Sequence, residues 1–172
     1  MKLLTTISSK GENYTANIIR DDNDRLNGKP AYFFFGDADN DVDGAPYWHK
    51  DPYGQAETSL HFNGKPVNGD EVPFIVLPPE VINLTPEIVL GCFATVEYPE
   101  GNFEPAVVAD VGPHNKLGEM SPCLLRRIGA PAFQNGNGGI DEQVVHYRFW
   151  PGVAANIEGK QFTLTPLGGK HG

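Results

Sequence analysis

The chain has 172 residues, with 13 Lys and Arg against 22 Asp and Glu and a formal net charge of −9 at pH 7. This length suits one domain covering residues 1–172, and the acidic balance argues against nucleic-acid binding, which needs a basic face. The 20 Gly and 15 Pro, beside 40% hydrophobic residues, favour a mainly β domain with many turns rather than a disordered chain.

Short apolar runs alternate with turn residues along the whole chain, as in strands that are joined by tight turns. The expected strands are Tyr14–Arg20, Ala31–Phe35, Val72–Leu77, Ile88–Glu97, Phe103–Ala109, Gln143–Trp150 and Gln161–Leu164. The sequence therefore predicts a mainly β fold: a compact six- to eight-stranded β-barrel, or a β-sandwich of similar size, with one or two short helices.

One segment carries helix signals at both of its ends. Ser121 can cap the N-terminus, Pro122 fits the first helical position, and Gly129 can end the helix. The two cysteines, Cys92 and Cys123, are too few for a disulfide scaffold and lack the spacing of zinc ligands. We interpret them as two buried thiols.

Neither a membrane span nor an export signal is visible. No apolar run approaches the roughly 20 residues that a spanning helix needs. The N-terminal Met1–Ser9 begins like a signal peptide but lacks its apolar core.

An acidic run from Asp37 to Gly44 places aspartates at every second position. Asp39, Asp41 and Asp43 match the opening of an EF-hand calcium loop, but Lys50 stands where the bidentate glutamate belongs. A structural Ca²⁺ held by these three aspartates, a solvated acidic turn, and one border of a binding cleft all remain open.

The same part of the chain concentrates the negative charge of the protein. Between Asp21 and Glu57 there are nine acidic residues and three basic ones. A surface of one sign attracts a polycation, at a rate that falls with salt. We therefore expect a cationic partner for this segment.

A second motif runs from Pro105 to Glu119. A short apolar strand delivers Asp110 at its end, a Gly-Pro turn follows, and Glu119 precedes the predicted helix. Two carboxyls in different environments are what a division into general acid and general base needs. A strand-end Asp and a first-turn Glu are also common structural choices, so this pairing alone is a weak signal.

A third group, Asp51–His61 with Tyr47, Trp48 and His49 before it, combines aromatic rings, an amide and acids, which together suit sugar rings and their hydroxyls. An ordered surface loop with one packed aromatic ring would have the same composition. The candidates for substrate binding, including those of the acidic run and the turn after Asp110, are Asp39, Asp41, Asp43, Tyr47, Trp48, Asp51, Tyr53, Gln55, Thr58 and His114.

Taken in order, several of these segments resemble a known family. They are Asp39–Gly44, Asp51–Gln55 with Thr58-Ser59, Val72–Pro78, and Ala109–Ser121, which contains the spacing D-x-G-P-x-x-x-x-G-E-x-S. Together they resemble the fungal-type chitosanases of glycoside hydrolase family seventy-five, over about residues 32–151. The motif has a looser similarity to double-psi β-barrel proteins, which include expansins and some lytic transglycosylases.

The resemblance implies an endo-acting, inverting hydrolase that cuts the β-1,4 linkages of chitosan, with Asp110 and Glu119 as its two essential carboxylates. It implies no required cofactor, a secreted or extracytoplasmic location, and, we expect, a monomer. Since Asp110 emerges from an apolar strand, we expect it to be the general acid and Glu119 the base, although the roles could be exchanged.

Two departures from the family pattern keep other functions open. Val42 stands where family members usually have a cysteine, and no signal sequence is visible. The first alternative is a muramidase that cuts the related glycan of peptidoglycan. The second is an expansin-like module that binds polysaccharide without cleaving it and would not need Glu119.

Overall fold

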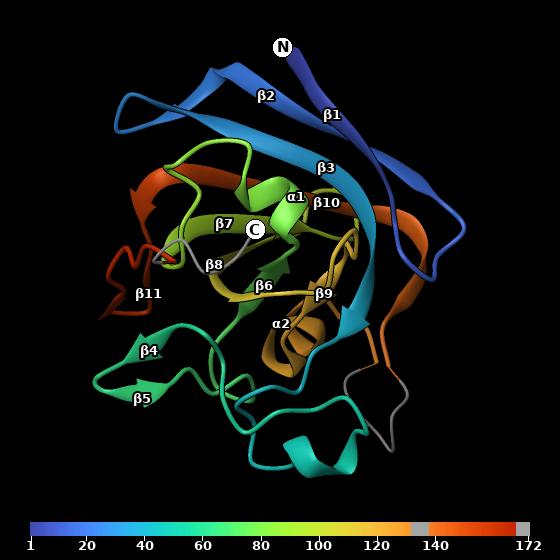
Figure 1. Cartoon of the computed structure of the whole chain (residues 1–172), viewed down its shortest axis with the longest axis vertical. Coiled ribbons are helices and arrows are strands. Elements are labelled where there is room, and N and C mark those ends of the chain that lie inside the picture. Colours follow the sequence, from blue (N-terminus) through green and yellow to red (C-terminus); the bar gives the residue numbers. More distant parts are fainter. Residues whose placement is uncertain (132–137, 168–172) are drawn as a thin grey trace.

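The computed structural model describes residues 1–131 and 138–167 and shows a β-barrel with short helices and small hairpins around it (Figure 1). The barrel closes because each of its six strands pairs with the next, and the last pairs with the first. In that order they are β3 (Lys29–Asn40), β10 (Ile140–Ala154), β7 (Cys92–Glu97), β8 (Phe103–Val111), β6 (Phe74–Leu77) and β9 (Glu119–Met120). The predicted mainly β barrel is confirmed.

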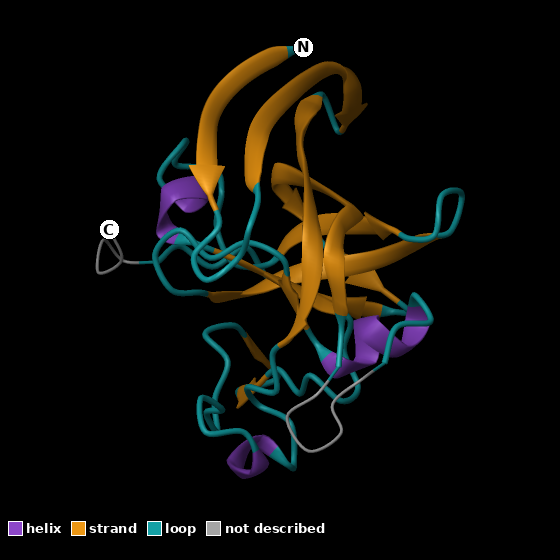
Figure 2. Cartoon of the chain, turned by 90° about the vertical axis from the view of Figure 1, so that its right-hand side faces the viewer, coloured by secondary structure: helices purple, strands orange, loops and turns teal. Residues whose placement is uncertain are grey.

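The remaining strands extend or flank the barrel. β2 (Thr15–Leu26) pairs with β3 and carries β1 (Lys2–Ser8) at the outer edge of the same sheet. Figure 2 shows this hairpin standing away from the barrel body. Two small hairpins form separate sheets: β4 (His61–Phe62) with β5 (Lys65–Pro66), and β11 (Asn156–Ile157) with β12 (Lys160–Gln161).

The helical elements are short, as predicted. They are α1 (Pro79–Ile82), α2 (Pro122–Arg127) and the single 3-10 turn η1 (Trp48–Lys50). In α2 the Ser121 hydroxyl accepts a hydrogen bond from the Leu124 N–H at 3.2 Å, and Gly129 follows with a φ of 76°. Both ends of this helix thus use the residues that the sequence indicated.

The core fills the barrel and takes side chains from both ends of the chain, from Ile7 to Phe162. Phe34 on β3 stacks on Tyr147 of β10, with ring centroids 4.8 Å apart. The Tyr147 hydroxyl donates to the Asp37 carbonyl at 2.5 Å, so this buried ring also satisfies its polar atom. Cys92 and Cys123 are both buried and unpaired, which confirms the interpretation as two thiols.

Some strand boundaries differ from the prediction. β1 was not expected, because most of its side chains are exposed and only Ile7 is buried, so the hydrophobic pattern is weak there. Its backbone pairing with β2 holds it instead. The expected strand Gln161–Leu164 is reduced to the last residue of β12, and Ile88–Glu97 becomes a strand only from Cys92.

Within residues 1–131 and 138–167, no helix has the length and apolar character to span a bilayer.

Candidate active site

Three acidic residues lie in one row across four adjacent strands of the barrel. Glu119 on β9 pairs with Asp39 of β3 on one side and with Val76 of β6 on the other. Val76 also pairs with Asp110 of β8. Because residues paired in this way share a face and neighbouring strands lie about 4.8 Å apart, the backbones of Asp110 and Glu119 stand about 10 Å apart.

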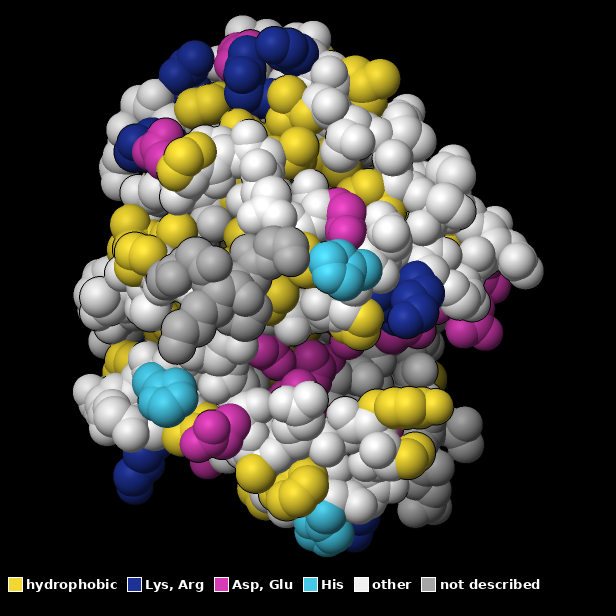
Figure 3. Space-filling view, in the orientation of Figure 1, with side chains coloured by type: hydrophobic (Ala, Val, Ile, Leu, Met, Phe, Trp, Pro, Cys, Tyr) yellow, Lys and Arg dark blue, Asp and Glu magenta, His cyan; other side chains and the backbone are white. Residues whose placement is uncertain are grey.

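An acidic cleft of about 230 Å³ opens beside this row. It is lined by Asn40, Asp41, Val42, Asp43, Asp51, Tyr53, Gly54, Gln55, Val111, Gly112, Pro113 and Glu119. Figure 3 shows acidic side chains gathered in a hollow across the middle of this face. No basic residue is among those that line the cleft, so its electrostatic potential favours cations.

Asp110 is fixed at the end of β8 by three donors. Its Oδ1 accepts hydrogen bonds from the Ser59 hydroxyl at 2.7 Å, the Ser59 N–H at 3.1 Å and the Val111 N–H at 3.0 Å. These donors fix the orientation of the carboxylate and stabilise its negative charge. The Asp110 side chain also lies within hydrogen-bonding reach of the Asp43 carboxyl.

Glu119 has the opposite environment. Its Oε1 is buried and has no hydrogen-bond partner among the described residues. Burial raises its pKa to about 7, and the carboxylates of Asp39 and Asp110 add to this rise while the charge of Lys116 opposes it. A carboxyl with this pKa is protonated in weakly acidic solution and available as a proton donor.

The side-chain amide of Asn40 lies in the same cleft. Both of its polar atoms are buried without a partner in the described part of the chain. Unpaired buried polar atoms cost stability, so they persist where a ligand or water supplies the missing bonds. Asn40 is therefore a further candidate for substrate binding.

Asp41, Asp43 and Asp110 form what we call the cleft cluster, in which one carboxylate oxygen of each lies within 4.8 Å of the others. Burial raises the pKa of Asp41 and of Asp43 to about 8, and repulsion among the three carboxylates adds to it. The Asp43 N–H donates to Asp41 Oδ1 at 2.8 Å, and the Gln55 N–H donates to Asp43 Oδ1 at 2.8 Å.

Asp39 belongs to a different group, the lysine-paired cluster of Glu12, Asp37 and Asp39. Lys116 Nζ lies 2.5 Å from Glu12 Oε1 and 2.6 Å from Asp39 Oδ2. The three aspartates proposed for Ca²⁺, Asp39, Asp41 and Asp43, are thus not one ligand set. The chain leaves the barrel after β3 and carries Asp41 and Asp43 toward Asp110, while Asp39 stays beside Lys116.

Five predicted substrate-binding residues line the cleft: Asp41, Asp43, Asp51, Tyr53 and Gln55. The Asp51 carboxylate accepts a hydrogen bond from the Tyr53 N–H at 2.8 Å, which shapes the loop after η1. The Tyr53 side chain is 89% exposed, so the ring is free to stack on a sugar face.

Tyr47 and Trp48 are not among the residues that line the cleft. The Tyr47 hydroxyl donates to Asp70 Oδ1 at 2.8 Å, and this bond ties the loop to the segment before β6. The Trp48 ring meets the His49 ring edge-on, at a centroid distance of 5.8 Å.

Thr58 and His114 also lie outside the cleft lining. Thr58 is buried, with its hydroxyl 2.9 Å from the Val67 carbonyl oxygen, which is a structural bond. His114 is exposed, and its Nδ1 lies 2.7 Å from Glu80 Oε2 beside α1. Both side chains have a partner within the protein, and their role in substrate binding stays a prediction.

Two residues important to the site's electrostatics were not selected from the sequence. Ser59 holds Asp110 from 51 positions away along the chain. Lys116 pairs with Asp39, and its positive charge also acts on Glu119. Both residues lie in the segments that carry the family resemblance, but a serine and a lysine in loops have no distinctive pattern of their own.

Comparisons with known proteins do not identify a family. No protein-family model matches the chain, and no curated protein is significantly similar to it.

Proposed function

We propose that this protein is an endo-acting glycoside hydrolase that cuts β-1,4-linked glycans of amino sugars, such as chitosan, with inversion at the anomeric carbon. The observation that carries this proposal is the Glu119 Oε1 in the acidic cleft, which is buried and has no hydrogen-bond partner among the described residues, while Asp110 clusters with Asp41 and Asp43, which line that cleft. The two environments separate an acid from a base.

The sequence favoured Asp110 as the general acid. The environments of the two carboxyls favour the reverse assignment, with Glu119 as the general acid and Asp110 as the base. Protonated Glu119 donates its proton to the glycosidic oxygen as the bond to C1 breaks. Asp110 takes a proton from a water molecule whose oxygen attacks C1 from the opposite face. The step consumes one water and leaves Glu119 ionised and Asp110 protonated, and solvent then restores both.

The separation of the two strands agrees with inversion. Inverting glycosidases hold their carboxyls roughly 6.5–9.5 Å apart, to leave room for water. The backbones of Asp110 and Glu119, on either side of Val76, are about 10 Å apart by strand spacing. A backbone separation of this size is compatible with carboxyls in that range.

The charge of the cleft supports a cationic glycan as the substrate. Asp41, Asp43 and Asp51 line it, no basic residue is among its described lining residues, and protonated glucosamine amines would relieve the repulsion within the cleft cluster. The proposed reaction needs no metal or organic cofactor. A polymeric substrate of this kind also implies that the enzyme acts outside the cytoplasm.

The test is hydrolysis of chitosan, which is measured by the release of reducing ends. Glu119→Gln and Asp110→Asn should each lower kcat by about 10²–10⁴-fold, while the matched control Asp141→Asn, at an exposed site on β10, should leave it unchanged. Retention of more than a tenth of the activity by either variant would remove that residue from the mechanism.

The pH dependence separates the two roles. With Glu119 as the acid, the rate should fall as pH rises through about 7, because the carboxyl then loses its proton. A rate that increased through this range would exclude Glu119 as the proton donor.

A further inference from the structure

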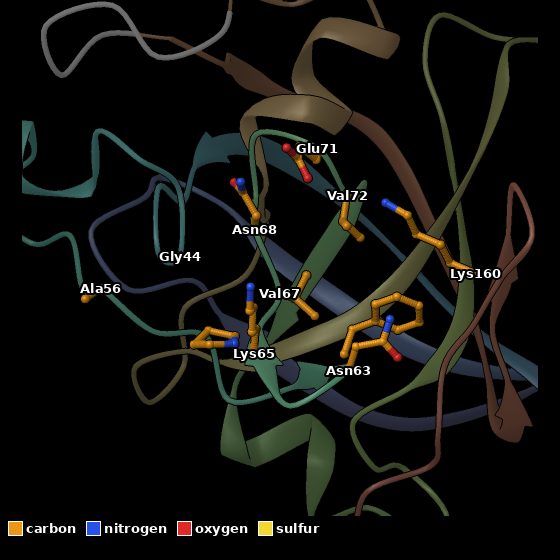
Figure 4. A pocket seen from close by; sticks show the side chains of 11 residues that line it. Gly44, Ala56, Asn63, Lys65, Val67, Asn68, Glu71, Val72 and Lys160 are labelled. Carbon is orange, nitrogen blue, oxygen red and sulfur yellow. The ribbon is translucent and has the colours of Figure 1, made fainter.

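A second, larger pocket of about 700 Å³ lies between the two small hairpins, β4–β5 and β11–β12 (Figure 4). Phe62, Pro66, Val67 and Val72 give it an apolar lining, and the Phe62 ring packs against that of Phe162 at a centroid distance of 5.1 Å. The mechanism proposed above does not use this pocket.

Each hairpin supplies one lysine to the pocket, and in both hairpins this lysine directly follows a tight turn. Asn63-Gly64 and Glu158-Gly159 form two-residue turns in which both residues have positive φ, and Lys65 and Lys160 follow directly. Figure 4 shows the two lysine side chains entering the pocket from different sides.

Neither lysine forms an ion pair with any described residue. Lys160 is half-buried, and its neighbour Glu158 pairs with Arg127 Nη1 at 2.6 Å instead. The two ammonium groups outnumber the single carboxylate of the pocket lining, that of Glu71, so the pocket attracts an anionic group.

The remaining polar groups narrow the chemistry of that ligand. Glu71 faces the same space, and Asn63 and Asn68 also line it (Figure 4). A nearby carboxylate repels a highly charged phosphate but accepts hydrogen bonds from N–H and O–H groups. A single carboxylate on a body with amide and hydroxyl donors fits this combination.

The pocket and the acidic cleft share a wall. Asp43 and Gln55 line the cleft, while the next residues, Gly44 and Ala56, line the pocket. The Gly44 N–H donates to the Gln55 carbonyl at 2.9 Å, which holds the two segments together. Only the thickness of this loop pair separates the two spaces.

We propose that this lysine pocket, defined by Lys65, Lys160 and Glu71, binds the carboxylate-bearing substituent of an acidic amino sugar, in a glycan whose backbone lies in the acidic cleft. This inference rests on the proposed hydrolase function and specifies its substrate class. The preferred glycan carries carboxylates as well as the protonated amines that the acidic cleft favours, rather than amines alone.

Direct binding tests the pocket without relying on catalysis. N-acetylmuramic acid and N-acetylglucosamine share the ring and the acetamide and differ by one lactyl carboxylate. In calorimetric titrations of the full chain, the acidic sugar should bind about fivefold to tenfold more tightly, as two partly exposed ion pairs allow. The double change Lys65→Met with Lys160→Met should abolish that preference, whereas Lys50→Met, outside the pocket, should keep it.

The outcomes distinguish this inference from the hydrolase proposal. Equal binding of the two sugars, or a preference that survives the double change, would overturn the lysine pocket as a carboxylate subsite, even in a chain that hydrolyses chitosan. A lysine-dependent preference in a chain that hydrolyses no glycan would support the pocket and contradict the hydrolase.

Discussion

The two acidic clusters of this protein have nearly the same geometry and different surroundings. In each, three carboxylates place oxygens within 4.8 Å of one another. In the lysine-paired cluster, Lys116 bridges two of the carboxylates and the Tyr14 hydroxyl donates to Asp37 Oδ1 at 2.7 Å. In the cleft cluster, backbone N–H groups and Ser59 donate hydrogen bonds, and no lysine or arginine of residues 1–131 and 138–167 forms an ion pair with its three carboxylates.

This difference shows that the proximity of carboxylates does not by itself define a binding site. Where a lysine is built in, two of the three carboxylates have a cationic partner, and the group ties the turn after β1 to β3 and to the loop before β9. Where no lysine is present, the balance must come from protons, from a cation or from a cationic ligand. The cleft cluster is therefore the one that is open to a partner.

The largest expected effect on stability comes from removal of Lys116, the cation of the lysine-paired cluster. Lys116→Met should lower the free energy of unfolding by about 2–3 kcal/mol, because Glu12 and Asp39 then lose a charged partner while they stay largely shielded from water. Urea unfolding at pH 7 measures this loss, with exposed Lys10→Met as the control. Equal stability of the two variants would contradict the structural role of the lysine-paired cluster.

In the cleft cluster, the removal of a negative charge should stabilise the fold. The pKa of Asp43 rises from 3.8 to about 8 on folding, so its contribution to stability is complete below about pH 4 and disappears as pH rises to about 8. Asp43→Asn cannot ionise, yet it can still accept the hydrogen bond of the Gln55 N–H.

We therefore expect Asp43→Asn to be more stable than the natural chain at pH 8.5, and the gain should shrink toward pH 5. Screening in the open cleft limits the gain to about 1 kcal/mol. Thermal unfolding across this pH range measures it, and Asp141→Asn serves as the exposed control. A loss of stability at pH 8.5 would mean that the cleft carboxylates do not repel one another.

The smallest effects concern ligands of the cleft cluster. Asp41, Asp43 and Asp110 each use one oxygen for internal hydrogen bonds, which leaves about three oxygens where Ca²⁺ takes six to eight. We expect 1 mM Ca²⁺ to raise the melting temperature by less than about 1 °C, and saturating glucosamine oligomers to raise it by about 2–4 °C. A larger shift with calcium, reversed by a chelator, would identify a metal site.

Local chemistry in the sequence was sufficient for several parts of this protein. Ser121, Pro122 and Gly129 define α2 because caps and φ preferences act within a few residues. The alternation of apolar and turn residues indicated a mainly β barrel, and the spacing from Asp110 to Glu119 selected two acidic residues that the fold brings to one row.

Long-range contacts decided the rest. Ser59 reaches Asp110 across 51 positions, Lys116 reaches Glu12 across 104, and the lysine pocket needs two hairpins from opposite parts of the chain. The fold separated Asp39 from Asp41, although they are two residues apart. It also set the pKa of Glu119, because burial and the field of neighbouring charges depend on the atoms that folding places around a group, whatever their distance along the chain.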